Sequence, residues 1–324
     1  MTPTQILRLA AAPLAQNDRG WDGSRSCMLR IVSSPTRLLL LSACLLWAVS
    51  FVATKVALEV VPPLTVVSLR LLIAATCFLP LLLTGDRRRQ LVNPLILKQL
   101  FGLSLFGAGL HYAIQTVGLQ LTTASNASLY VVTGPISILF LSVALLGERL
   151  TARKVLGVVI AIVGVLVVMG IGTVTGFELR EHVLGDLMVL TSVVLWGCFT
   201  VFGKKLTDRL GALTVIASVT VIGAMWMAPI GWLEMRWRGF SLAAVHDKGW
   251  IAIGFLGAGC SFLATLLYFM ALERTESQKV GVYLYTIPPM TAVFAALMLG
   301  EHITINLVVG SLLVMAGVIL TERG

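Results

Sequence analysis

Long apolar stretches follow one another along most of the chain, separated by short polar connections. An α-helix needs about 20 apolar residues to cross a hydrocarbon core roughly 30 Å thick. Ten stretches meet this requirement, with expected bounds 38–59, 62–84, 97–120, 124–146, 153–172, 184–205, 211–233, 250–272, 277–299 and 303–321. Each is apolar all round and too long for a strand, which excludes a β-barrel with its alternating pattern. The pattern predicts an all-α membrane protein with ten transmembrane helices.

The second half of the chain repeats residues of the first half at fixed spacings. One set recurs 153 positions later: Tyr130, Thr133, Pro135, Gly147, Glu148, Thr151, Gly157 and Gly164 correspond to Tyr283, Thr286, Pro288, Gly300, Glu301, Thr304, Gly310 and Gly317. An earlier set recurs 149 positions later: Trp47, Lys55, Thr65 and Pro80 correspond to Trp196, Lys204, Thr214 and Pro229. One longer polar connection in the second copy, residues 234–249, explains both spacings. A self-match at a fixed period decides the architecture before any local motif does.

The repeat divides the predicted helices into two groups of five, residues 38–172 and 184–321. Because each group crosses the membrane an odd number of times, the second must lie upside down relative to the first. Inverted repeats of this kind are the construction by which secondary transporters achieve alternating access, with the substrate held near the midplane. The sequence therefore predicts two inverted five-helix repeats around a central site.

Composition and charge agree with a membrane location. The chain is 57% hydrophobic and 12% charged, with a mean hydropathy of +0.94, which no soluble domain could bury. The net charge of +9 lies mainly in alternate loops, around Arg87, Arg153, Lys204 and Arg274, with one exception near Arg236. By the positive-inside rule, both termini face the cytoplasm. The charge thus reflects topology and gives no indication of nucleic-acid binding.

Residues 1–36 form a polar, basic tail that we expect on the cytoplasmic side. The tail lacks a single apolar core followed by a small-residue cleavage site, so it does not have the pattern of a signal peptide. Met28 is an alternative start. We expect this tail to carry no chemistry.

Three polar side chains are expected at a similar depth within the outer half of the membrane. At 1.5 Å of rise per residue, Arg70 lies about 12 Å, His111 about 13 Å and Tyr130 about 10 Å below the outer boundary. No carboxylate is expected at that depth. The guanidinium of Arg70 would therefore pair with a substrate anion in a cavity or hydrogen-bond to backbone carbonyls. His111 is the group that could titrate near neutral pH, as a proton carrier or as a hydrogen-bonded packing residue.

Aromatic side chains are also expected near the middle of the membrane. Trp47 and Trp196 correspond in the repeat and lie near mid-span, away from the interfacial positions where tryptophan usually gathers. Lining a central cavity would explain both facts, whereas ordinary packing explains only the location. Tyr268, Tyr283 and Tyr285 add aromatic rings with polar tips, which suit an amphipathic or aromatic solute.

Two corresponding prolines, Pro135 and Pro288, are expected well inside the fourth and ninth helices. Each would free the carbonyl four residues earlier, that of Val131 or Leu284, and such a carbonyl needs another partner or a wet cavity. A structural kink without substrate contact is the alternative. The candidate residues of the substrate pathway are therefore Trp47, Arg70, His111, Tyr130, Thr133, Pro135, Trp196, Tyr268, Tyr283, Tyr285 and Pro288.

The segments Leu45-Leu-Trp-Ala-Val-Ser-Phe-Val-Ala-Thr-Lys55, Ser68-Leu-Arg-Leu-Leu72, Thr123-Ala-Ser-Asn-Ala127 and Pro135 to Glu148 together resemble the EamA-type members of the drug/metabolite transporter superfamily. The resemblance covers both halves, because order, spacing and duplication agree. It implies a ten-helix carrier in the bacterial inner membrane that exports small metabolites, often amino acids or related compounds. The second copy departs from the first, since Val219 replaces Arg70 and Thr200 replaces Phe51.

These patterns predict a secondary transporter, most simply an exporter. A passive channel is the main alternative, because a wet pore would also tolerate Arg70 and His111. A membrane-embedded enzyme is disfavoured by the lack of GxSxG or HExxH motifs, and ATP-driven transport by the lack of GxxxxGK[ST]. We expect no catalytic residue, cofactor or metal. The expected partners are the lipid bilayer and a small solute, with the chain acting as a monomer or a homodimer.

Overall fold

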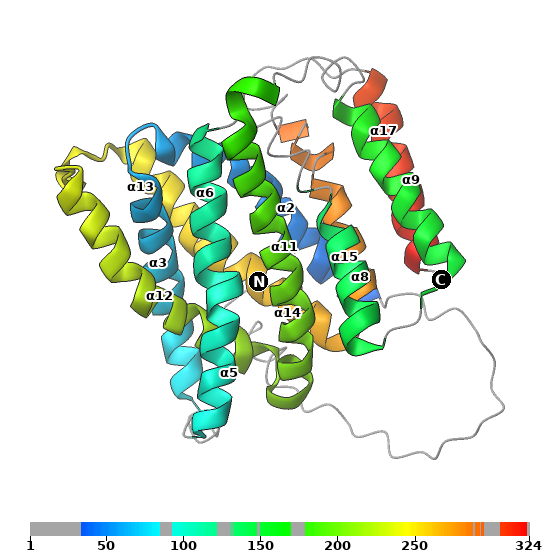
Figure 1. The fold of residues 1–324 in the computed structure, drawn as a ribbon, viewed down its shortest axis with the longest axis horizontal. Coiled ribbons are helices and arrows are strands. Elements are labelled where there is room, and N and C mark those ends of the chain that lie inside the picture. Colours follow the sequence, from blue (N-terminus) through cyan, green and yellow to red (C-terminus); the bar gives the residue numbers. More distant parts are fainter. Residues whose placement is uncertain are drawn as a thin grey trace. The chain divides into compact units, whose positions relative to one another are not determined.

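The structure is a computed structural model, and it describes residues 34–84, 93–121, 131, 133–147, 150–169, 179–287, 289–291, 293–294 and 305–322. Throughout these ranges the regular structure is helical (Figure 1). The first half contains α2 (Ser34–Leu58), α3 (Pro63–Leu83), α5 (Pro94–Ser104), η1 (Leu105–Leu110), α6 (His111–Leu121), α8 (Gly134–Leu146) and α9 (Ala152–Met169). The second contains α11 (Leu179–Leu210), α12 (Ala212–Trp237), η2 (Leu242–Ala244), α13 (Asp247–Gly254), η3 (Phe255–Ala264), α14 (Thr265–Arg274), α15 (Ser277–Val282), η4 (Tyr283–Thr286) and α17 (Ile305–Glu322).

Six of the described helical stretches are long and apolar enough to cross a membrane: Pro35–Leu58, Pro63–Leu83, Pro94–Leu121, Leu187–Leu210, Ala212–Trp237 and Asp247–Arg274. They correspond to the predicted first three helices of each half. The predicted fourth and ninth helices, 124–146 and 277–299, fall partly outside the described residues, as do the connections beside them. The all-helical membrane architecture is therefore confirmed at this level.

The third helix of each half is interrupted by a π-helical segment. In the first half η1 lies between α5 and α6, and in the second half η3 lies between α13 and α14. A π-helical segment inserts an extra residue into a helical turn and is frequent at functional sites. The two halves therefore share a local irregularity as well as a sequence pattern.

Helices α3 and α12 lie side by side and run in opposite directions. The carboxylate of Glu234, near the end of α12, accepts hydrogen bonds from the backbone N–H and the hydroxyl of Thr65 at 2.7 and 2.9 Å. One turn further along, Gly231 packs against Ser68. The Thr65 N–H is one of the donors that a helix leaves unpaired in its first turn, so Glu234 satisfies it and compensates for its own burial.

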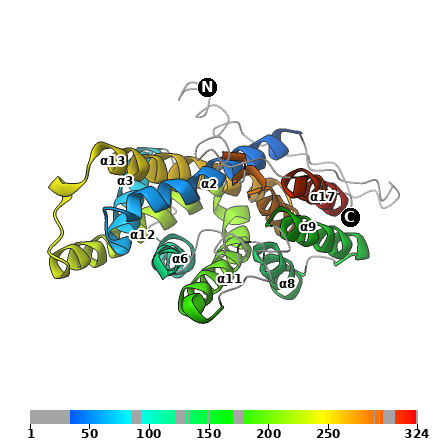
Figure 2. The same cartoon turned by 90° about the horizontal axis from the view of Figure 1, so that it is seen from above.

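Helices α9 and α17 also form an antiparallel pair, visible in both ribbon views (Figures 1 and 2). A Cβ atom added to Gly164 would lie 2.7 Å from the Gly310 carbonyl oxygen, and one added to Gly157 would lie 2.7 Å from that of Gly317. Only glycine allows the two backbones to approach this closely, and close approach is how helices associate in lipid. These glycines, which the repeat relates to one another, therefore allow α9 and α17 to pack closely.

Candidate functional site

A cavity lies among α2, α3, α6, α8, α11 and the segment around η4. Its lining residues are Trp47, Ser50, Phe51, Thr54, Arg70, His111, Tyr112, Gln115, Leu119, Val131, Gly134, Val193, Trp196, Leu284 and Ile287. The centre of a water molecule can reach about 80 Å³ of this space. One water needs about 10–15 Å³ by the same measure, so the cavity has room for several waters or a small solute.

The base of the cavity is formed by two tryptophans that pack against each other. The rings of Trp47 on α2 and Trp196 on α11 meet edge to face, with centroids 5.2 Å apart and an interplanar angle of 89°. Behind them lies the ring of Tyr268, 5.2 Å from Trp47 and 5.6 Å from Trp196. The Tyr268 hydroxyl forms a 3.1 Å hydrogen bond with Thr200, which satisfies it in a fully buried position. This cluster separates the cavity from the packed residues beyond it.

Arg70 brings a positive charge into the wall of the cavity. Its Nε–H donates to the hydroxyl of Ser261 in η3 at 2.8 Å, and its guanidinium carbon lies 4.1 Å from the centroid of the Tyr112 ring. The side chain is 96% buried, since its exposed fraction is 4%. A hydroxyl and an aromatic face orient the guanidinium but do not neutralise it. Of the two sequence-based alternatives for Arg70, the geometry favours cavity lining over contact with backbone carbonyls.

His111 lies at the start of α6, directly after η1, and is buried in the same wall. Its Nδ1 is 2.8 Å from the Ser192 carbonyl oxygen on α11. Because a carbonyl only accepts, Nδ1 must carry the proton of this hydrogen bond, and in the neutral ring Nε2 is then an acceptor. The His111 ring also packs 5.0 Å from the Trp196 ring. The histidine is therefore fixed by a hydrogen bond and still lines the cavity.

The structure brings four of the candidate residues together at the cavity: Trp47, Arg70, His111 and Trp196. Tyr268 supports the two tryptophans from behind. Other candidates are near but not lining: Thr133 and Pro135 flank the lining residue Gly134, and the buried Tyr283 and Tyr285 flank the lining residue Leu284. Tyr130 and Pro288 lie outside the described residues.

One local expectation about proline differs from the geometry. Pro135 follows Gly134, the first residue of α8 as described, but Val131 is helical too and the residues beside it lie outside the described part, so the predicted interior position of Pro135 stays a prediction. The Leu284 carbonyl, predicted to be freed, accepts a hydrogen bond from the backbone N–H of Ile287. The helix tightens to a 3₁₀ turn at η4, which supplies the carbonyl with a donor three residues later. That carbonyl therefore already has a backbone donor, and its residue lines the cavity.

Several lining residues were missed by the sequence analysis. Ser50, Phe51 and Thr54 follow Trp47 at three, four and seven residues, and Gln115 follows His111 at four. Residues at these intervals lie on one face of a helix. Helical spacing from Trp47 and His111 would therefore have found them, whereas each is unremarkable when considered alone.

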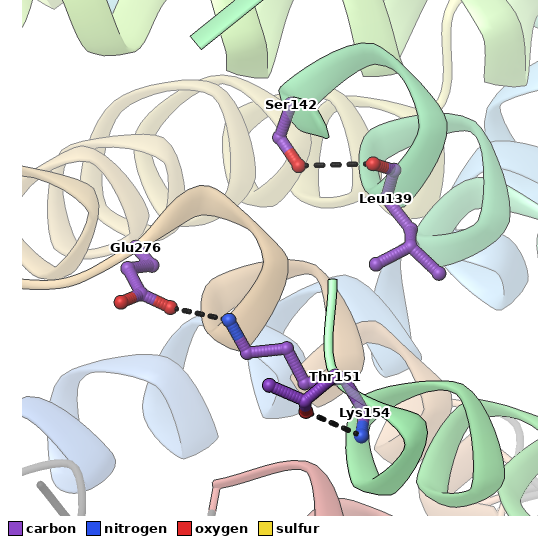
Figure 3. Close-up of polar contacts among 5 residues, drawn as sticks. All are labelled: Leu139, Ser142, Thr151, Lys154 and Glu276. Carbon is purple, nitrogen blue, oxygen red and sulfur yellow. Dashed lines mark hydrogen bonds and ion pairs between the residues drawn. The ribbon is translucent and has the colours of Figure 1, made fainter. Parts of the chain in front are cut away.

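Beyond the tryptophans, an ion pair joins the two halves near their basic loops (Figure 3). The Nζ of Lys154 in α9 lies 2.8 Å from Oε2 of Glu276, which directly precedes α15. The hydroxyl of Thr151 accepts the Lys154 backbone N–H and so caps α9. Partial burial disfavours ionisation of Glu276, but the hydrogen bond and charge of Lys154, with the charges of Lys279 and Lys204, lower its pKa below the usual value. The Glu276 carboxyl is therefore ionised near neutral pH.

Two corresponding lysines cap corresponding helices. Lys55 donates to the carbonyl oxygen of Leu119 at 2.9 Å, and Lys204 donates to that of Leu272 at 2.7 Å. Lys204 follows Lys55 by 149 residues and Leu272 follows Leu119 by 153, the same two spacings found in the repeat. A cation near the C-terminal carbonyls of a helix is favourable, because those carbonyls lack helical donors. Each lysine therefore has a defined partner at the end of a helix.

The EamA-like transporter family matches the chain twice, over residues 35–170 and residues 183–323. A transporter of Archaeoglobus fulgidus described as uncharacterized is 30% identical over 90% of this chain and 98% of its own length. A "Probable amino-acid metabolite efflux pump" of Salmonella typhimurium is 26% identical, over 86% of this chain and 91% of the relative. A "Probable terminal-alkyne amino-acid exporter" of Streptantibioticus cattleyicolor is 29% identical, over 86% and 90%.

A solved crystal structure shares the fold. It aligns with a TM-score of 0.73 over 90% of this chain and 98% of the solved chain, at 23% sequence identity. At that identity the likeness concerns the fold alone. Together with the double family match, it covers both halves of the repeat.

Proposed function

Because the chain belongs to the EamA-like transporter family, we propose that it is a secondary transporter that exports small metabolites, amino acids or related solutes, by alternating access. The proposal includes ten transmembrane helices in two inverted five-helix repeats, residues 38–172 and 184–321. It also places the protein in a bacterial inner membrane with both termini in the cytoplasm. No catalytic residue, cofactor or metal takes part.

One observation carries this proposal. Trp47 and Trp196 correspond in the sequence repeat and lie one in each family match, and their rings meet at the base of one cavity. Carriers with inverted repeats hold their substrate between the repeats near the middle of the membrane. A solute in this cavity would contact both halves, so movement of one half against the other would change its access.

The packing of corresponding helices supports the inversion. Gly157 of α9 faces Gly317 of α17, and Gly164 faces Gly310, so the order is reversed between the two helices. Helices α3 and α12 show the same reversal. Thr65 of α3 contacts Glu234 of α12, whereas Ser68, one turn later in α3, contacts Gly231, one turn earlier in α12. Two corresponding helices related by an axis in the membrane plane must run in opposite directions. Corresponding helices of parallel repeats would run in the same direction.

The location of the cavity supports an outward-facing state. Thr54 lies four residues from the end of α2 and Leu119 two residues from the end of α6, so these lining residues extend toward the end that the positive-inside rule assigns to the outside. On the other side of the tryptophans, Phe199 and Phe269 are buried, and Lys154 pairs with Glu276. Export would require these cytoplasmic contacts to open during part of the cycle.

Transport can be measured with the purified protein in liposomes. We expect saturable counterflow of at least one member of a panel of amino acids and related carboxylates, with protein-free liposomes as the control. A passive channel would give flux that does not saturate and no counterflow. Liposomes that show neither flux nor counterflow for the whole panel would contradict the transport proposal for this class of solute.

A further inference from the structure

The cavity has one strong cation and no described acid in its wall. Arg70 lines the space, and the described lining residues include no Asp or Glu. The Nε–H of Arg70 donates a hydrogen bond to the hydroxyl of Ser261. Within the described part of the chain, no protein group accepts a hydrogen bond from the terminal N–H groups of Arg70. A guanidinium has five N–H donors, four of them on the terminal nitrogens. Arg70 is thus held in place through one donor and has the other four available to a solute.

We propose that the cavity selects small monocarboxylates whose remaining part is uncharged, in preference to zwitterionic α-amino acids, and that Arg70 binds the carboxylate. This inference rests on the proposed transport function and narrows its substrate class. The terminal nitrogens of a guanidinium match the two oxygens of a carboxylate in a bidentate contact. The Tyr112 ring below the guanidinium and the Ser261 hydroxyl fix the plane in which that contact forms.

The same wall offers no matching site for an ammonium group. A buried ammonium requires a carboxylate or several well-placed acceptors to compensate for lost hydration. The neutral polar side chains of the wall include Ser50, Thr54, Tyr112 and Gln115, with Nε2 of His111 as a further acceptor. These groups suit a hydroxyl or an amide N–H, whose loss of hydration is much smaller than that of a charged ammonium.

Cation–π contacts are the alternative means of holding an ammonium. Trp47 and Trp196 are the best rings for such a contact, but they pack edge to face against each other and onto Tyr268. Their exposed fractions are only 9% and 7%, so little of either π-face is open to a solute. The nearby charge of Arg70 would also repel a second cation. The tryptophans therefore suit the apolar body of the solute better than its ammonium group.

The inference can be tested with four probes that share one phenyl ring: 3-phenylpropionate, N-acetylphenylalanine, phenylalanine and phenethylamine. Binding to the full-length protein in detergent is followed by the shift of its melting temperature across a concentration series. We expect the first two probes to bind at least about ten-fold more tightly than phenylalanine, and phenethylamine to bind most weakly. Phenylalanine binding as tightly as 3-phenylpropionate would overturn the inference.

An Arg70→Gln variant assigns the effect to the proposed residue, and Arg236→Gln is the matched control because Arg236 is exposed at the end of α12. We expect Arg70→Gln to lose about ten-fold or more in affinity for 3-phenylpropionate, Arg70→Lys to lose less, and the control to be unchanged. All variants must elute as the parent does in size-exclusion chromatography. If Arg70→Gln is misfolded, Arg70→Lys decides: unaltered affinity for both carboxylates would overturn the role of Arg70.

Failure of this inference and failure of the transport proposal give different results. Counterflow of phenylalanine or other amino acids without binding of 3-phenylpropionate or N-acetylphenylalanine would overturn the inference and leave the carrier standing. Lack of binding by all four probes also overturns it. Saturable counterflow of 3-phenylpropionate that Arg70→Gln abolishes would support both.

Discussion

The indole rings of Trp47 and Trp196, which are 149 residues apart in the sequence, meet edge to face with their centroids 5.2 Å apart. They come from corresponding positions of two similar halves, so this contact lies close to the axis that would relate those halves. Its geometry is the favourable one for aromatic rings, because the positive edge of one ring faces the negative face of the other.

We expect this contact to give a measurable coupling energy. In a double-mutant cycle of Trp47→Leu and Trp196→Leu, the two changes should be non-additive by about 0.5–1.5 kcal/mol in the free energy of unfolding. The measurement is reversible unfolding in mixed micelles. The control cycle pairs Trp47→Leu with Trp232→Leu, because Trp232 is 56% exposed. Additivity in the first cycle as well as in the control would show that the rings are merely adjacent.

The ion pair between Lys154 and Glu276 predicts a pH-dependent stability. Glu276→Gln removes the carboxylate of Glu276 from the buried Lys154 ammonium, at a cost of roughly 1–2 kcal/mol, below the range for fully buried pairs because Glu276 is half exposed. The pKa of Glu276 is lowered in the folded protein, so its contribution is present above the unfolded pKa and is lost as pH falls through the folded pKa. The difference in melting temperature between parent and variant should therefore be full at pH 7 and shrink in acid. A constant difference across that range would contradict the assignment.

The same pair offers a test of alternating access. If the Lys154 to Glu276 contact closes the cytoplasmic side, Glu276→Gln should shift the population toward the inward-facing state. A cysteine introduced at Val193 in the cavity of a cysteine-free background should then react faster with a membrane-impermeant thiol reagent from the inside and more slowly from the outside. Equal labelling rates in parent and variant, from both sides, would count against a gating role.

Close contact between α9 and α17 makes Gly164 sensitive to a single methyl group. Gly164→Ala would place its Cβ 2.7 Å from the Gly310 carbonyl oxygen, so we expect a loss of about 1–3 kcal/mol of stability. Gly102→Ala is the matched control, since nothing lies within 4 Å of the added Cβ, and it should be neutral or slightly stabilising. Melting temperatures of the three proteins in one detergent decide the matter. Equal values for both variants would mean that the helices are further apart.

The lysine caps should have similar effects in the two halves. Lys55→Met and Lys204→Met each remove a charged donor from a C-terminal helix carbonyl, and each should cost about 1–2 kcal/mol. Lys204 also lies 3.0 Å from Asp208, which is half exposed, so Asp208→Asn should cost below about 1 kcal/mol. If Asp208→Asn costs as much as Lys204→Met, the exposed ion pair matters more than the carbonyl.

The architecture could be predicted because the constraints on a chain in lipid are strict. Backbone groups must be satisfied within each helix, so apolar length alone located the six spans found among the described residues. The self-match agrees with the two separate family matches. The sequence also predicted that four residues line the cavity: Arg70, His111, Trp47 and Trp196. Charged or polar-tipped side chains in the middle of a membrane span are costly unless they are paired or face a cavity. These residues stand out against an apolar background.

Other parts of the cavity could not be predicted from such signals. The contact between Arg70 and Ser261 joins residues 191 positions apart. Nothing in the sequence around a serine in an apolar helix indicates which distant residue it will contact. Tyr112 was overlooked beside His111, although its ring underlies the guanidinium. The effect of Pro288 on the Leu284 carbonyl was misjudged, because a 3₁₀ turn supplied a donor that a regular α-helix would not. Long-range pairing and local helix tightening depend on the packed structure.

The uncompensated guanidinium in the cavity has an electrical consequence. With a monocarboxylate bound to Arg70, the site as a whole would be neutral, whereas the returning unloaded carrier would move a net positive charge within the membrane field. A full crossing by one elementary charge is worth about 2.3 kcal/mol per 100 mV. With a potential that is negative inside, the voltage would therefore draw the unloaded site toward the cytoplasm and drive it back to collect the next solute, without any coupled ion.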